Sequence, residues 1–315
     1  MEILDLRHFT SSDLRPLLED EVAAWGGTLC WDYRSSAEMI FRYIDAKILP
    51  GYAAIERGSV VGYSFFVYEG SKGVIGDLFV SPKRVDARDI EIRMVEHVIE
   101  TLQESPGVHR VEAQLLTHST GDLAAPFLST GFQRYRRLFL SLQLVGPGAP
   151  ALRAPRSLND VQIRPWTEQD YQPAAGIITT AYRAHIDSEI NDQYRTNAGS
   201  MRFLNNIVRF PGCGVFDNDS SFVAVHKPSR ATVGVILCSR IRHDVGHVTQ
   251  VCLLPEYRGL GIGEALIAAS HRALSARNVS QLSLTVTEAN RNAVELYRRI
   301  GFEEQRVFDA FVWEG

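Results

Sequence analysis

The sequence predicts a mixed α/β protein made of two similar domains, each with a largely antiparallel sheet flanked by helices. Its 315 residues exceed the usual size of one hydrophobic core and suggest two domains of about 150 residues. The stretches "LRHFTSSDLRP" from Leu6 and "IRPWTEQDYQP" from Ile163 share an Arg, an aromatic residue, a Thr, an Asp and a Pro at identical spacing. Between them, residues 146–158 are rich in glycine and proline and predict a linker. We therefore expect domains at 1–145 and 159–315.

The second half carries the clearer periodic patterns. Residues 161–166 predict a strand, Thr167 is a plausible cap for a first helix, and a second helix is expected near 198–209. The other expected elements are strands at 221–227, 231–241 and 245–254, a helix after the glycines at 259–263, a strand over "QLSLTVT", a helix over 290–300 and a closing strand over "GFEEQRVFDAFVW". The predicted order is β-α-α-β-β-β-α-β-α-β, which contains an antiparallel meander.

Composition excludes several classes of protein. A net charge of -4 and a pI near 6.2 give no basic field of the kind that nucleic-acid binding needs. The N-terminus "MEILDLRHFT" is acidic rather than basic, and no apolar run approaches the roughly 18 residues of a membrane span. The four cysteines lie far apart without C-x-x-C spacing, so neither a disulfide framework nor a metal site is expected. We expect a cytoplasmic protein that binds neither nucleic acid nor membranes.

Three alternating glycines follow an apolar strand in "LLPEYRGLGIGEAL". Glycine lets the backbone approach a ligand closely, and free N–H groups at a helix N-terminus bind phosphate oxygens. No Gly-Lys-Ser/Thr follows for a Walker loop, and Leu266 stands where a dinucleotide fingerprint needs its last glycine. Residues 258–263 therefore predict a pyrophosphate cradle, and the alternative is a glycine-rich turn without a ligand.

The sequence here resembles the GNAT acyl-CoA N-acyltransferase superfamily, in the tandem two-domain form found in mycothiol synthase. The family has R/Q-x-x-G-x-G/A after a strand and N-x-x-A-x-x-x-Y-x-x-x-G-F further on. The first motif stands at 258–263, and the second at "NRNAVELYRRIGF", with Asn290, Tyr297, Gly301 and Phe302 near the family's positions. The resemblance covers 161–315 well and the first half only in outline. It implies two tandem GNAT domains.

The resemblance also implies acetyl-CoA, or another acyl-CoA, as cofactor. Its pantetheine arm would pair with the strand at 245–254, where the Val251 N–H would meet the thioester carbonyl and stabilise the developing oxyanion. Leu253 is next along the same face. The remaining cofactor-binding positions implied by the two motifs are Arg258, Gly259, Gly261, Ile262, Gly263 and Asn290.

Two residues are candidates for proton transfer. Tyr297 matches the family's general acid, and a phenol can protonate the departing thiolate. The alternative is a buried structural tyrosine. His247 stands eleven residues before Arg258, where the family often has a carboxylate base, and regular alternation would place it on the face of Val251 and Leu253. Imidazole can act as the base, although a lone strand histidine is more often structural.

The function expected from this resemblance is transfer of an acetyl group to a primary amine of a small molecule or peptide by direct attack. The segment "HIDSEIND" at 185–192 holds three acids and would suit a cationic amine, although a solvated loop explains it equally well. A mycothiol-synthase-like amino-sugar acetyltransferase is one alternative, and a non-catalytic acyl-CoA-binding or regulatory module is another. The sequence leaves the acceptor and the oligomeric state open.

The first half repeats the fold but lacks the chemical motifs. Aligning Pro82 with Pro255 sets "KRVDARDIE" against "EYRGLGIGE", so that none of the three glycines remains, and Phe127 stands opposite Tyr297. We expect one productive site per chain, in 161–315. The alternative is a first half that still holds CoA without turnover, through backbone pairing to the strand at 73–80.

Overall fold

The computed structural model describes residues 1–146, 149–150, 158, 160–209 and 212–315. Most of the linker expected at 146–158 lies outside the described residues. The chain divides into two compact units, the first made of Met1–Arg137 and Val307–Gly315 and the second of Leu138–Arg306. Within the described ranges, no helix is long and apolar enough to cross a membrane.

The first unit contains a mixed sheet whose strands follow the order β1-β2-β3-β4-β5-β13. Neighbours are antiparallel except β4 and β5, which are parallel. The elements are β1 (Glu2–Asp5), α1 (Ser11–Leu29), α2 (Arg34–Asp45), β2 (Gly51–Glu56), β3 (Ser59–Glu69), β4 (Lys72–Val80), α3 (Ala87–Glu104), β5 (Arg110–Gln114), α4 (Ala124–Ser129) and the start of β6 (Gln133–Gln143). The apolar face of α3 packs on this sheet and forms the core of the unit.

The C-terminal strand has a partner that the sequence did not indicate. We expected "GFEEQRVFDAFVW" to close the sheet of the second half, but residues Ala310–Glu314 of β13 (Glu303–Glu314) pair antiparallel with β5. Phe311 anchors the strand by stacking on Phe127, with ring centroids 4.0 Å apart. The alternation of apolar residues predicts a strand but does not identify its neighbour, because pairing is decided by contacts distant in sequence.

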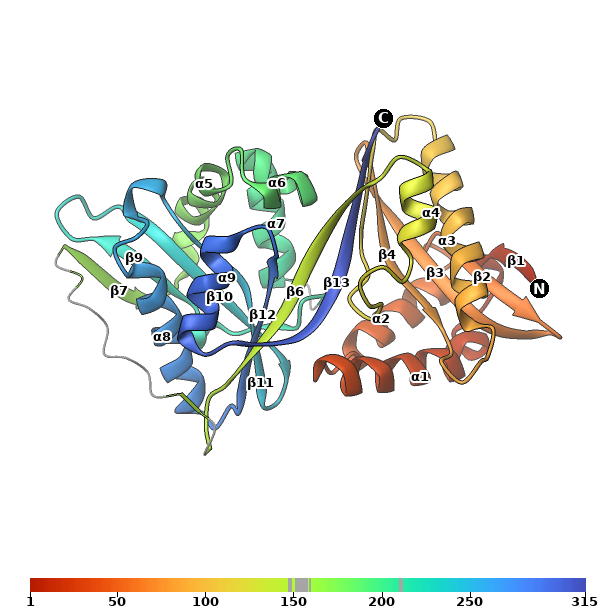
Figure 1. The fold of residues 1–315 in the computed structure, drawn as a ribbon, viewed down its shortest axis with the longest axis horizontal. Coiled ribbons are helices and arrows are strands. Elements are labelled where there is room, and N and C mark those ends of the chain that lie inside the picture. The colour runs from red at the N-terminus through yellow and green to blue at the C-terminus, as the bar shows by residue number, and fades with distance from the viewer. Residues whose placement is uncertain (147–148, 151–157, 159, 210–211) are drawn as a thin grey trace. The chain divides into compact units, whose positions relative to one another are not determined.

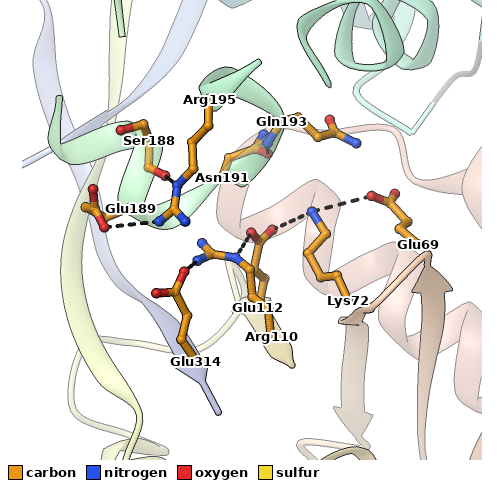
Figure 2. A network of polar contacts seen from close by, with 10 residues as sticks. All are labelled: Glu69, Lys72, Arg110, Glu112, Ser188, Glu189, Asn191, Gln193, Arg195 and Glu314. Carbon is orange, nitrogen blue, oxygen red and sulfur yellow. Dashed lines mark hydrogen bonds and ion pairs between the residues drawn. The ribbon is translucent and has the colours of Figure 1, made fainter. Parts of the chain in front are cut away.

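Charged side chains pair across β4, β5 and β13, as Figure 2 shows, and those on β4 and β5 are buried. Lys72 Nζ lies 3.1 Å from Glu112 Oε2, and Arg110 Nε donates to Glu112 Oε1 over 2.6 Å. Arg110 also pairs with Glu314 of the C-terminal strand. Because removing one partner would leave an uncompensated buried charge, these pairs fix the register of the three strands.

The second unit matches the predicted order of elements closely, and its strands follow β12-β11-β10-β9-β7, with β8 on β10. Its elements are β7 (Val161–Pro165), α5 (Tyr171–Ala181), α6 (Ile186–Ile190), α7 (Asn197–Arg209), β8 (Val215–Phe216), β9 (Phe222–His226), β10 (Thr232–Arg242), β11 (Val245–Leu253), α8 (Ile262–Ser275), β12 (Gln281–Thr287) and α9 (Arg291–Ile300). Figure 1 shows α5 and α8 against these strands. The core beneath α5 includes Val235, Leu237 and Cys252.

Candidate functional site

The two central strands of the second unit separate partway along their length. β11 pairs in parallel with β12 only over Val245–Val248, although both strands continue beyond this point. The Leu254 N–H donates to Val233 O on the β10 side over 2.9 Å. Since successive N–H groups of a strand point to opposite edges, those of Val251 and Leu253 point to the edge that β12 has left. This edge offers backbone donors to an extended ligand.

A β-bulge lies where the strands separate. Val248 stands opposite Cys238 and Gln250 opposite Leu237, so that Thr249 is the extra residue of β11. The Thr249 hydroxyl donates to Leu237 O over 3.0 Å and fixes the bulge. An extra residue reverses the alternation of side chains beyond it.

The bulge overturns one prediction about His247. Regular alternation placed His247 on the face of Val251 and Leu253, and that is wrong, because the extra residue lies between them. Gly246 faces α8, where a Cβ on it would stand 2.9 Å from Leu274. Leu253 also faces α8, at its first turn. His247, adjacent to Gly246, therefore points to the other face of the sheet.

The surroundings of His247 are those of a packed side chain. It is 6% exposed, its Nδ1 lies 2.9 Å from Ser283 Oγ, and its ring stacks on Phe139 at 5.9 Å. Burial lowers the pKa of His247 to about 4, so the imidazole is neutral at pH 7 and binds a proton weakly. In the described part of the chain, no group of three or more His, Cys, Asp or Glu side chains is placed to hold a metal ion.

The glycine loop opens the N-terminus of α8. Gly259 and Gly261 adopt left-handed φ angles of +75° and +83°, which only glycine takes without strain. A Cβ on Gly259 would meet no atom within 4 Å, so the space in front of the loop is open. Arg258 is bound to the end of α5, where its Nη2 donates to Ala181 O over 2.7 Å. Its guanidinium thus holds the loop, while the first N–H groups of α8, from Ile262 and Gly263, remain outside the helical hydrogen bonds.

Helix α9 presents Tyr297 to the site. Asn290 caps the helix by accepting the Ala293 N–H over 3.4 Å. Tyr297 is 7% exposed, and its hydroxyl makes no hydrogen bond among the described residues. Burial, and after it the charge of Asp187 and the nearby Cys252, raises the pKa of Tyr297 above its ordinary value. The phenol is therefore protonated at neutral pH and available as a donor.

A carboxylate that sequence reasoning did not single out lies near this phenol. Asp187, in α6, accepts a hydrogen bond from the Thr287 hydroxyl at the last residue of β12. The His185 Nδ1 lies 3.6 Å from its other oxygen. The sequence located only the acidic segment 185–192, because nothing in it distinguishes Asp187 from its two acidic neighbours.

Arg195 holds the segment that carries this carboxylate. Its Nε donates to Ser188 O over 2.8 Å and its Nη2 lies 3.1 Å from Glu189 (Figure 2). Asp187 therefore stands in an ordered segment rather than in a loose loop.

The equivalent loop of the first unit is closed by side chains. Arg84 pairs with Glu56 and Asp86 at 2.6 and 2.8 Å. Arg88, which aligns with Gly261, pairs with Asp122 at 2.5 Å. No glycine occurs at 84–90, and Phe127 is fully buried. These ion pairs occupy the cations that a phosphate would need. They support the prediction, which remains to be tested, that only the second unit is active.

Comparison with known protein families finds a match within the second half of the chain. Residues 186–302 match the family described as "Acetyltransferase (GNAT) family". The chain is 38% identical over 71 residues to an N-alpha-acetyltransferase of Sulfurisphaera tokodaii, covering 22% of this chain and 42% of that protein. It is 30% identical over 205 residues to a mycothiol acetyltransferase of Thermobifida fusca, covering 58% of this chain and 59% of that protein. The chain thus spans about half the length of these relatives.

Solved structures extend the likeness in fold to both halves. A GCN5-related N-acetyltransferase from Sphaerobacter thermophilus is 16% identical, with a TM-score of 0.64, and the match covers 99% of this chain and 95% of that one. A tandem GNAT protein from the clavulanic acid biosynthesis pathway is also 16% identical, with a TM-score of 0.61, covering 99% of this chain and 98% of that one. Both halves therefore have the fold of tandem proteins of this type.

We predict that His247→Gln removes a pH dependence of stability. With a folded pKa of about 4 and an unfolded value near 6.5, His247 stays neutral on folding. The free energy of unfolding is therefore at its full value above about pH 6.5. It falls by about 3 kcal/mol as the pH is lowered to about 4, because the unfolded chain then binds a proton that the folded one does not. Urea denaturation at about pH 6.5 and about pH 4 should show this loss in the wild type. The control His243→Gln should show the same loss, because the side chain of His243 is 88% exposed. An equal loss in His247→Gln would contradict the assignment.

Proposed function

Because the chain belongs to the GNAT superfamily, we propose that its second unit is an N-acetyltransferase that moves an acetyl group from acetyl-CoA to a primary amine of a small molecule or peptide. The observation that carries the proposal is the edge of β11 that β12 leaves unpaired, along which the N–H groups of Val251 and Leu253 point. This edge leads directly to the loop at 258–263 and the open N-terminus of α8. A ligand with an amide-bearing arm and a phosphate group suits both features.

The residues present fit acetyl-CoA, which supplies a thioester-activated acetyl group. The amides of Gly261, Ile262 and Gly263 would hold the phosphate oxygens, because they lie at a helix N-terminus behind an open space. Arg258 acts as a positioning residue through its bond to Ala181. The Val251 N–H would face the acyl oxygen and stabilise the charge that develops there.

Proton transfer is assigned to Tyr297 and Asp187. An alkyl ammonium with a pKa of about 10 is neutral roughly one time in a thousand at pH 7, so the attacking amine must lose a proton. Asp187 would attract the ammonium and receive that proton, directly or through water. Tyr297 would protonate the leaving thiolate. His247 is left out, because its ring is buried between paired strands, where it contacts Ser283 and Phe139.

Direct attack is preferred to an acyl-cysteine route. Cys252 is 8% exposed and faces the core beneath α5, and burial raises the pKa of its thiol to about 12. A thiol with this pKa carries almost no thiolate at neutral pH and is a weak nucleophile.

The test is a thiol-release assay with acetyl-CoA over a panel of amines, amino sugars and peptides. Release that depends on one acceptor class supports the enzyme and identifies its substrate. Amino sugars are included because one relative is a mycothiol acetyltransferase. Binding of CoA without release for any acceptor would favour a non-catalytic module, and no binding would refute the proposal.

We predict that Gly261→Glu lowers CoA affinity about a thousandfold. A carboxylate about 4 Å from a phosphate costs about 4 kcal/mol at an effective dielectric of about 20. The left-handed backbone at +83° strains most other residues, but asparagine tolerates it and adds no charge, so Gly261→Asn is the matched control. Calorimetry on folded proteins should show the larger loss in Gly261→Glu. Equal affinities in both variants would remove the loop from the phosphate site.

We predict that Tyr297→Phe lowers kcat by about 10²- to 10⁴-fold with little change in CoA affinity, because the hydroxyl is the proton donor and makes no other hydrogen bond among the described residues. Phe preserves the ring contact with Phe302 at 5.7 Å, so stability should be unchanged. Single-turnover kinetics measure the chemical step itself. A rate near that of the wild type would return Tyr297 to a packing role.

A further inference from the structure

The side chain of Gln250 occupies the edge of β11 at the proposed oxyanion position. Its Oε1 accepts the Val251 N–H over 3.0 Å and the Tyr182 hydroxyl over 2.8 Å. Burial raises the pKa of Tyr182 well above its ordinary value, so the phenol keeps its proton and acts as a donor. Two donors thus converge on one amide oxygen.

The other end of the same amide is unsatisfied. Gln250 is 4% exposed, and its Nε2 has no hydrogen-bond partner among the described residues. Exchanging the two atoms would set Nε2 against the Val251 N–H, donor against donor, so the assignment of oxygen and nitrogen is fixed. A buried N–H group left unpaired costs about 1–3 kcal/mol. Such a cost is tolerated where the group gains a partner in another state of the protein.

We propose that Gln250 is a second hydrogen-bond donor, beside the Val251 N–H, for the carbonyl oxygen of the acyl donor. This inference rests on the proposed acetyl-CoA-dependent function. When a carbonyl oxygen takes the Val251 N–H, Gln250 Oε1 loses that bond. Rotation of the amide then brings Nε2 toward the carbonyl oxygen, with Tyr182 accepting its second proton. The same side chain would thus serve both as a cap of the strand edge and as part of the oxyanion site.

The first unit contains the same arrangement with a residue that cannot donate when ionised. β4 pairs with β5 only over Lys72–Ile75, and its bulge falls at Gly76. Next to the bulge, Asp77 Oδ1 accepts the Leu78 N–H over 2.8 Å and its Oδ2 accepts the Tyr33 hydroxyl over 3.2 Å. In both units a side-chain oxygen thus accepts the next backbone N–H and a tyrosine hydroxyl. The difference is that Gln250 also carries amide N–H groups, whereas Asp77 has a second oxygen in their place.

The experiment compares Gln250→Leu and Gln250→Glu with Gln281→Leu, which makes the same change at the paired end of β12. Infrared difference spectroscopy follows the thioester carbonyl of isotope-labelled acetyl-CoA. Calorimetry measures the affinities for acetyl-CoA and for CoA, which lacks that carbonyl. Kinetic measurements use the acceptor found in the thiol-release panel. In the wild type and Gln281→Leu, binding should lower the carbonyl frequency through two hydrogen bonds. Both Gln250 variants should reduce this shift and lower kcat by about 10²- to 10³-fold, the usual effect of removing one oxyanion donor, with CoA affinity kept within about threefold.

Each result decides the proposal. An unchanged carbonyl frequency and kcat in Gln250→Leu would overturn it while leaving the acetyltransferase function intact. An equal loss of CoA and acetyl-CoA affinity would also overturn it, because a merely structural glutamine would act on both. Failure of the folded wild type to bind acetyl-CoA would overturn the proposed function and this inference together.

Discussion

The separation of β11 from β12 after Val248 is the constraint on which the site depends. A buried strand edge must satisfy its backbone N–H groups, with another strand, a side chain or a ligand. The Thr249 bulge ends the pairing and turns Gln250 so that its side chain can reach the next N–H of its own strand. The open edge, the glycine loop at its end and the α9 tyrosine are all positioned relative to this one departure from regular pairing.

Comparison of the two units distinguishes features that belong to the fold from features that the proposed chemistry needs. Both have four paired residues, a bulge and a capped N–H at corresponding positions, in β4 and in β11. These features recur because they arise from strand packing. The differences lie at the loop, where the space in front of Gly259 is open in one unit while Arg84 and Arg88 form ion pairs in the other. A repeated fold therefore does not imply a repeated function.

Sequence reasoning succeeded where a pattern is local and failed where it is not. The glycine loop, the helix with Tyr297 and the meander follow from spacing alone. The face of His247 could not be predicted, because alternation assumes a regular strand and nothing in "HVTQV" marks Thr249 as a bulge. The partner of the C-terminal strand depends on Phe127 and Arg110, far away in sequence. Gln250 gives no signal at all, since its role depends on an unpaired amide visible only in the folded chain.

The electrostatics of the site favour an acid and a base that support each other. Burial and the negative charge of Asp187 keep the Tyr297 phenol protonated, which suits the late proton donation that we propose for it. In the proposed reaction, the same carboxylate, which Thr287 orients at the end of β12, would attract a cationic amine. Transfer of the amine proton to this carboxylate would neutralise its charge and make the phenol more acidic at the moment when the leaving thiolate needs a proton. The proposed order of proton transfers thus follows from one charge and needs no histidine.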